Sequence, residues 1–135
     1  MTRLLLAACL ALSFSASASA AEATYRVEAP KTLKVKKGVQ ASARVSVVPR
    51  EGSHVSPDAP ISVDVSATPH IEVPHAKLGR HDAKETAQKG VAFDIPILAM
   101  QEGTGAVDAN LVFFICTEKL CERRKEHVQL AVLAE

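Results

Sequence analysis

The sequence has few of the residues from which metal centres are commonly built. It contains 135 residues, of which three are Cys, two are Met and none is Trp. Of the Cys and Met residues, only Met100, Cys116 and Cys121 lie beyond residues 1–20. A single Met excludes a methionine-rich copper site, and one close cysteine pair cannot build a four-cysteine zinc site. We expect no metal and no cofactor.

Histidine is the remaining common ligand type, and its spacing does not favour a metal site. The five histidines are His54, His70, His75, His81 and His127. The separations between positions 70, 75 and 81 match no closed zinc pattern. Copper or zinc binding through imidazole stays open as an alternative to histidines that simply lie in loops or on the surface.

Motifs for hydrolysis and nucleotide binding are absent as well. The sequence has no Gly-x-Ser-x-Gly segment and no phosphate-binding loop. Basic and acidic residues number 16 and 15, for a net charge of +1, so no basic excess is available for a nucleic acid. The composition therefore favours neither a hydrolase nor a nucleic-acid-binding protein.

The one long apolar run lies at the amino terminus. Arg3 precedes the apolar segment Leu4–Leu12, and a stretch of Ser and Ala then ends in a small-x-small motif at Ala20. This order is typical of a secretory signal peptide, residues 1–20, and no later run approaches the roughly 20 residues of a membrane helix. A lipoprotein attached through Cys9 is the alternative. We expect a periplasmic or secreted protein whose mature domain is residues 21–135.

Beyond the signal, apolar residues recur with a period of two, which is typical of strands with one buried face. We expect strands near residues 25–27, 33–35, 41–47, 61–67, 91–97, 107–115 and 128–132, with Gly and Pro between them. Short strands punctuated in this way predict one all-β domain, a sandwich. Its inward positions should include Val45, Val47, Val63, Val65, Phe93, Ile95, Leu111, Phe113, Ile115 and Leu130. Pro96 indicates a sheet edge or a bulge, because proline cannot donate to a ladder.

Two segments are ambiguous. Residues 75–90 are polar with a weak apolar stripe, which favours a long loop with one or two helical turns. Residues 117–127 are rich in Glu, Lys and Arg, which favour helix by intrinsic propensity. A helix would place Cys116 and Cys121 about 140° apart around its axis, whereas a hairpin with loop 117–120 would place them opposite each other. The alternation on both sides supports the hairpin.

The sequence alone leaves the role of the cysteine pair open. Its spacing is not the Cys-x-x-Cys of thioredoxin-like centres, and in an exported domain it can be a structural disulfide. It can also be a redox pair. Phe114 shares a strand face with Cys116, so both shielding of that sulfur and plain core packing are open for Phe114.

Two segments carry a resemblance to a known family. They are EGSHVSPDAPISVDV at residues 51–65 and FFICTEKLCERRKEHVQLAV at residues 113–132. Together they resemble the amino-terminal periplasmic domain of the thiol:disulfide interchange protein DsbD and the related disulfide bond corrector proteins. The first segment matches the family through Gly52, His54, Ser56 and Pro57, and the second matches it through Cys116 and Cys121.

This resemblance implies an immunoglobulin-like β-sandwich and a thiol-disulfide exchange function. By analogy, Cys116 and Cys121 would be the catalytic pair, and the partner would be a thioredoxin-like periplasmic protein or a membrane thiol-disulfide transporter. The resemblance tips the balance towards this redox interpretation. The alternative is a non-catalytic exported β-sandwich that serves as a binding or assembly module and has a structural disulfide.

Overall fold

Strands dominate residues 23–135, the part of the chain that the computed structural model describes. The predicted signal peptide, its cleavage site and the Cys9 alternative fall outside the described residues. The elements, in chain order, are β1 (Tyr25–Glu28), β2 (Thr32–Val35), β3 (Ala41–Pro49), β4 (His54–Val55), β5 (Ser62–Ala67), β6 (Ile71–Glu72), β7 (Lys77–Leu78), the 3-10 helix η1 (Arg80–Asp82), β8 (Lys84–Glu85), β9 (Val91–Ala99), β10 (Gly103–Cys116) and β11 (Cys121–Ala134). No helix within residues 23–135 is long and apolar enough to cross a membrane.

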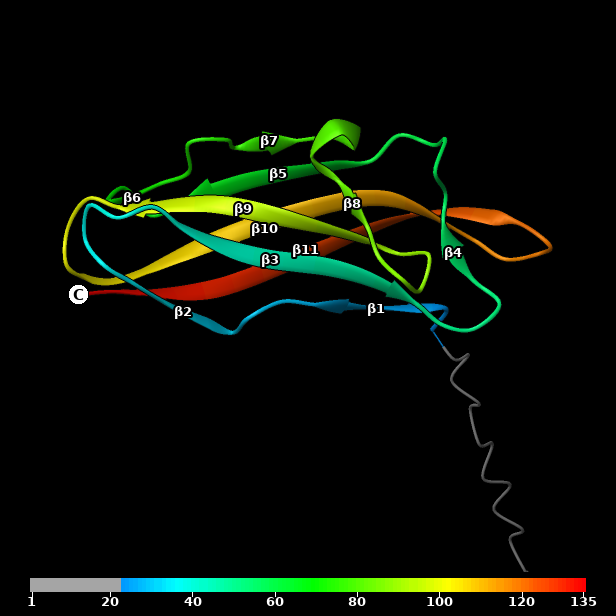
Figure 1. The fold of residues 1–135 in the computed structure, drawn as a ribbon, viewed down its shortest axis with the longest axis horizontal. Coiled ribbons are helices and arrows are strands. Elements are labelled where there is room, and N and C mark those ends of the chain that lie inside the picture. The colour runs from blue at the N-terminus through cyan, green and yellow to red at the C-terminus, as the bar shows by residue number, and fades with distance from the viewer. Residues whose placement is uncertain (1–22) are drawn as a thin grey trace, which may run out of the picture.

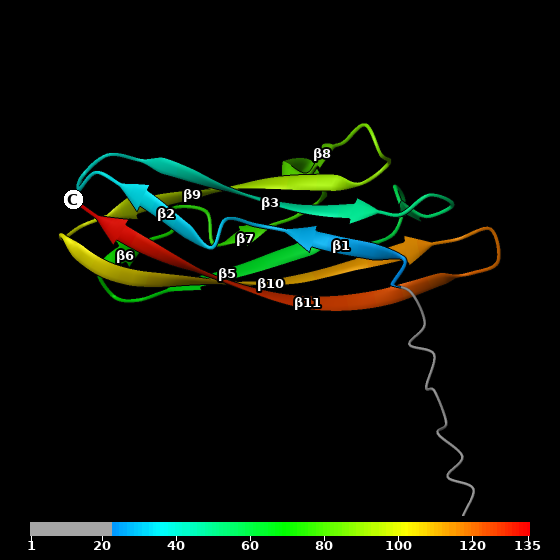
Figure 2. The ribbon, with the colours of Figure 1, turned by 90° about the horizontal axis from the view of Figure 1, so that it is seen from below.

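The strands form two sheets packed face to face (Figures 1 and 2). One sheet has the order β1-β3-β9-β6, with β8 also paired to β9. The other has the order β2-β11-β10-β5-β7, with β4 paired to the end of β10. The first sheet corresponds to strands A, B, E and D of an immunoglobulin domain, and β5, β10 and β11 correspond to C, F and G. The predicted immunoglobulin-like β-sandwich is confirmed.

The amino-terminal strand is divided between the two sheets. β1 pairs antiparallel with β3, whereas β2 pairs parallel with the last residues of β11, from Ala131 to Ala134. Pro30 lies in the crossing between β1 and β2, where the chain leaves one sheet for the other. Proline cannot donate a ladder hydrogen bond and suits such a crossing.

The core lies between the sheets and follows the predicted alternation. All ten predicted inward residues are at most 8% exposed, and Val45, Phe93 and Phe113 are fully buried. No polar or charged residue is buried among the described residues. Burial of this apolar face provides the main driving force for folding.

Pro96 lies where the sequence pattern requires. It pairs with Ser42 of β3, and on the other side of β9 the partners are β8 at residues 91–92 and β6 at residues 98–99. Within the described residues no strand pairs with β9 between them, so the strand has a local edge at Pro96, as predicted.

The two ambiguous segments are also settled. Residues 117–127 form no helix, because β11 begins at Cys121 and pairs with β10 along its whole length. The segment 75–90 contains one helical turn, η1, as predicted, and also the short strands β7 and β8, which were not predicted. Two-residue strands have no alternation for a sequence pattern to detect.

Candidate functional site

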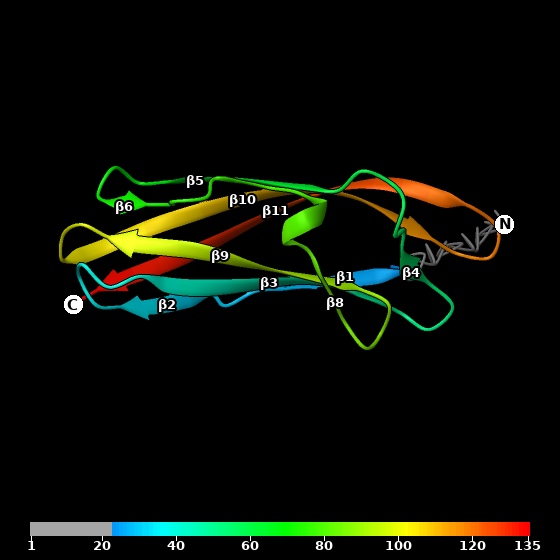
Figure 3. The same cartoon turned by 45° about the horizontal axis from the view of Figure 1, so that its top comes forward.

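The two cysteines meet at the end of the longest hairpin. Cys116 ends β10 and Cys121 begins β11; they are ladder partners joined by a disulfide, with their Cα atoms 4.0 Å apart. The Thr117 amide donates to the Leu120 carbonyl at 2.9 Å, which closes the loop. The hairpin prediction for the pair is confirmed, and the loop extends past the neighbouring strands at one end of the sandwich (Figure 3).

The two halves of the disulfide differ in exposure. Cys116 is 3% exposed, because β4 pairs with β10 on the side away from β11 and places His54 opposite Cys116. The Ser56 amide then donates to the Phe114 carbonyl at 2.9 Å and continues this cover. Cys121 is exposed at the start of an edge strand. An attacking thiolate would therefore reach Cys121 more readily than Cys116.

The structure brings together the two segments that carry the family resemblance. Gly52 has φ +82°, a left-handed conformation that glycine adopts without strain, and it lies in the turn that leads into β4. His54 stands beside Cys116 in the ladder. The Ser56 hydroxyl accepts a hydrogen bond from the Ala59 amide at 3.2 Å and shapes the turn that follows. Gly52, His54 and Ser56 are therefore all part of β4 or of the turns on either side of it, next to Cys116.

Two grooves flank His54 at this end of the molecule. One has a volume of about 340 Å³ and includes Pro57, Arg80 and Lys89 in its lining. The other has a volume of about 550 Å³ and extends to Thr117 at the hairpin loop. Gly90, in the loop after β8, lies so close to β3 that a Cβ atom added there would come within 2.2 Å of the Val47 carbonyl oxygen.

Phe114 is half-buried on the face that it shares with Cys116. Its ladder partner on β11 is Arg123 and not a cysteine. Shielding of the sulfur by this ring stays a prediction.

The histidines are dispersed. His75 lies 3.6 Å from Asp82, and His127 lies 2.9 Å from Asp108, each an exposed pair. Within residues 23–135, no three His, Cys, Asp or Glu side chains gather in a way that could hold a metal ion.

A polar cluster that the sequence interpretation missed lies on the inward-facing side of Cys121–His127, the hairpin half of β11. Glu122, Arg124 and Glu126 are ladder partners of Ile115, Phe113 and Leu111, so they lie on the sheet face that is turned toward the other sheet, with Glu122 still exposed to solvent. The Tyr25 hydroxyl donates to the Glu126 carboxylate, and the Tyr25 ring packs edge-on against Phe113 with centroids 5.1 Å apart. Burial, followed by the bond to Glu126, raises the pKa of Tyr25 to about 12. The signal was present, because these residues continue the inward positions of Val132, Leu130 and Val128.

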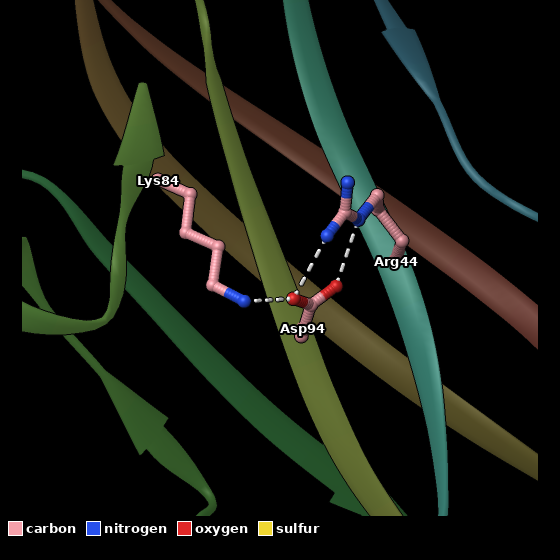
Figure 4. A network of polar contacts seen from close by, with 3 residues as sticks. All are labelled: Arg44, Lys84 and Asp94. Atoms are coloured by element: carbon pink, nitrogen blue, oxygen red, sulfur yellow. Dashed lines mark hydrogen bonds and ion pairs between the residues drawn. The ribbon is translucent and has the colours of Figure 1, made fainter. Parts of the chain in front are cut away.

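A second polar network lies on the outer face of the other sheet (Figure 4). Arg44 binds both carboxylate oxygens of Asp94, at 2.8 and 3.0 Å, and the Lys84 ammonium lies 2.6 Å from one of them. The hydrogen bonds from Arg44 and Lys84 hold the pKa of Asp94 far below its usual value. The network connects β3, β9 and β8.

Comparison with known proteins places the chain in no family, because no family model and no curated protein matches it. Among solved structures it is similar to AggA, the major subunit of aggregative adherence fimbriae type I of Escherichia coli, with a TM-score of 0.46 and 8% identity over 82% of this chain and 94% of that one. It is also similar to murine CRIg, with a TM-score of 0.42 and 7% identity over 82% and 98%. The CooA pilin subunit of enterotoxigenic Escherichia coli has a TM-score of 0.37 and 7% identity over 84% and 99%.

Proposed function

We propose that this chain is a non-catalytic exported β-sandwich that works as a binding or assembly module, with Cys116–Cys121 as a structural disulfide. The observation that carries the proposal is the position of Cys116. It is 3% exposed and has a paired strand on each side, His54 of β4 and Cys121 of β11. The disulfide therefore links two strands at a point where three strands, β4, β10 and β11, lie side by side.

The ladder explains why a staple is useful at this point. β5 supports β10 only as far as the pair Ser62–Val112, and β2 supports β11 only from Ala131 onward. Beyond Val112 the hairpin is held by its own ladder, by β4 with the Ser56 amide, and by the contacts of Tyr25. A cross-link at the tip opposes fraying there, and closing a loop of this size stabilises the fold by about 2 kcal/mol on the chain-entropy account.

Export remains part of the proposal. It is supported by the signal-like sequence of residues 1–20 and by the disulfide, which persists in oxidising compartments.

The second candidate is thiol-disulfide exchange with a thioredoxin-like partner, and the exposure of Cys121 favours it. The partner thiolate would attack the Cys121 sulfur, form a mixed disulfide and release Cys116 as a thiolate, which takes up a proton. A second partner thiolate would then attack the partner's own sulfur in the mixed disulfide and release Cys121. The partner dithiol would thereby be oxidised by two electrons, and the pair would be reduced.

Measurements on the wild-type disulfide separate the two functions, and two single variants serve as controls for the accessibility of each sulfur. In Cys116→Ala the exposed Cys121 thiol remains, and in the matched variant Cys121→Ala the covered Cys116 thiol remains. Each is oxidised with a small aromatic disulfide to activate the thiol and is then mixed with a thioredoxin-like protein that lacks its resolving cysteine. Chemically activated Cys121 reports only accessibility, so the deciding measurement is the wild-type disulfide.

For the wild type, a structural disulfide predicts a reduction potential below about −300 mV and no mixed disulfide with the same partner under native conditions. The double variant Cys116→Ala/Cys121→Ala should remain folded with a lower midpoint of unfolding. A wild-type mixed disulfide at Cys121, together with a potential well above that value, would overturn the structural assignment and establish exchange.

A further inference from the structure

The hairpin half of β11 has an open edge. β2 covers β11 only from Ala131 to Ala134, because the chain crosses at Ala29–Lys31 to the other sheet, where β1 pairs with β3. From Cys121 to Leu130, no strand among residues 23–135 pairs with β11 on the side away from β10. Figure 2 shows β2 beside the last part of β11 and β1 beside β3, with the crossing between them. The open edge is roughly 30 Å long, at about 3.3 Å per residue.

Two hydrogen bonds establish which backbone groups face this edge. The bond from the Thr117 amide to the Leu120 carbonyl makes those residues a hydrogen-bonded ladder pair. The next pair, Cys116 and Cys121, is therefore one whose backbone groups do not hydrogen-bond each other. At the other end, the Ala131 amide donates outward to the Lys31 carbonyl. Both observations show that the odd-numbered residues of β11 direct their amide and carbonyl groups away from β10. The residues with outward-facing amides and carbonyls are Cys121, Arg123, Lys125, His127 and Gln129.

The side chains of these residues make a basic stripe on the outer face. Arg123, Lys125 and His127 are all exposed. His127 is bound to Asp108 at 2.9 Å. Arg123 and Lys125 have no side-chain hydrogen bond or ion pair among the described residues. A strand added beside β11 would place alternate side chains next to these two free cations.

The same stripe disfavours a second copy of this chain as the added strand. Two copies related by a two-fold axis would pair outward-facing residues with outward-facing residues. An axis at position 123 or 125 opposes Arg123 or Lys125 to itself, and an axis at position 124 opposes Arg123 to Lys125. Like charges directly opposite each other destabilise a sheet, and charged edges protect strands from self-association.

We propose that the open edge of β11 binds an extended acidic segment of another protein as an added strand. Carboxylate side chains at alternate positions of that segment lie beside Arg123 and Lys125, and its backbone bonds the outward amides and carbonyls. The opposite side chains of the segment face the groove of about 690 Å³ between β1 and β11, whose lining includes Tyr25, Val27 and Arg124. The inference deepens the proposed binding function and rests on it.

The test uses the oxidised mature protein and a synthetic ten-residue peptide in which Glu alternates with Thr. Backbone amide hydrogen exchange is measured by NMR with and without peptide. We expect about tenfold or greater slowing at the amides of Arg123, Lys125 and His127. The amides of Glu122 and Arg124 already bond to β10, so they serve as internal controls and should change little. A matched peptide with Lys in place of Glu should have no effect.

Two further reagents separate strand addition from simple charge attraction. An acidic peptide that is N-methylated on its β11-facing edge keeps its charge but cannot donate to the edge, so its binding should be lost. Lys125→Thr removes one charge and should weaken binding by about two- to fivefold. Lys125→Pro also removes an outward amide and should weaken it further. If Lys125→Pro does not fold, the N-methylated peptide still tests the same bond.

Several results would overturn the proposal. They are unchanged amide exchange at Arg123, Lys125 and His127 in millimolar acidic peptide, equally slowed exchange with the Lys peptide, and equal binding of the N-methylated peptide. Failure of the structural assignment of the disulfide would appear separately, as a mixed disulfide at Cys121 in the absence of any peptide. The two proposals can therefore fail independently.

Discussion

The two halves of β11 have the same backbone pairing with β10 but different surroundings. From Val128 onward, the inward residues are apolar, and from Ala131 onward β2 covers the outer edge. From Cys121 to His127, the inward residues Glu122, Arg124 and Glu126 are charged and the edge is open. The comparison indicates that one half of the strand builds the core, whereas the other is held by a disulfide and a few polar contacts and presents its backbone to solvent.

The largest expected effect comes from the core half. Leu130 is 1% exposed, and Leu130→Ala should lower the free energy of unfolding by about 2–5 kcal/mol, because it removes buried methyl groups and leaves a cavity. Urea unfolding followed by circular dichroism measures this change. A loss below about 1 kcal/mol would mean that the two halves do not differ as described.

Removal of the disulfide should have the next largest effect. Cys116→Ala/Cys121→Ala should lower the free energy of unfolding by about 2 kcal/mol. Amide exchange should become faster near Phe114 and Arg123 and stay unchanged near Leu130, because the bond fastens only the end of the ladder. Uniform acceleration along β11 would show that the hairpin end and the core open as one unit.

Tyr25 tests the polar contacts of the hairpin half. Tyr25→Phe keeps the ring contact with Phe113 and removes the bond to Glu126, at an expected loss of about 1 kcal/mol. Because the pKa of Tyr25 is raised in the folded state, its contribution is complete below the ordinary value of 10.0 and is lost as the pH rises to about 12. Unfolding measured across this range should therefore show a steeper decline for the wild type than for Tyr25→Phe.

The smallest effect on stability is expected at the open edge. Arg123→Thr should change the free energy of unfolding by less than about 0.5 kcal/mol, because the side chain is exposed and has no bonded partner among residues 23–135. The same substitution should weaken binding of the acidic peptide. A matched change at Lys34, an exposed residue of β2, the strand that covers the other part of the edge, should affect neither property.

Much of the fold could be predicted from the alternation of apolar residues. Strands such as β3, β5 and β9 bury one face each, so the sequence carries their period directly. The opposed cysteines followed from the alternation on both sides of the loop. The split of the first strand between two sheets could not be predicted, because it depends on which strands lie beside β1 and β2 in space.

The candidate sites show the same division. The sequence identified Cys116 and Cys121 but not the strand β4 that covers one of them, because a two-residue strand leaves no pattern. The inward direction of Arg124 could be obtained by counting back in steps of two from Leu130. The open edge could not, since an edge is defined by the absence of a neighbouring strand.

The parallel pairing of β2 with the end of β11 also determines how the domain would resist a pulling force. The Arg50 amide bonds the Thr24 carbonyl near the hairpin end, and the Lys37 amide bonds the Glu135 carbonyl at the opposite end. Tension applied through the two ends of the domain would therefore draw β2 and β11 in opposite directions along their common axis. Their hydrogen bonds would be loaded in shear and would have to break together, which makes mechanical unfolding slow in a chain held at both ends.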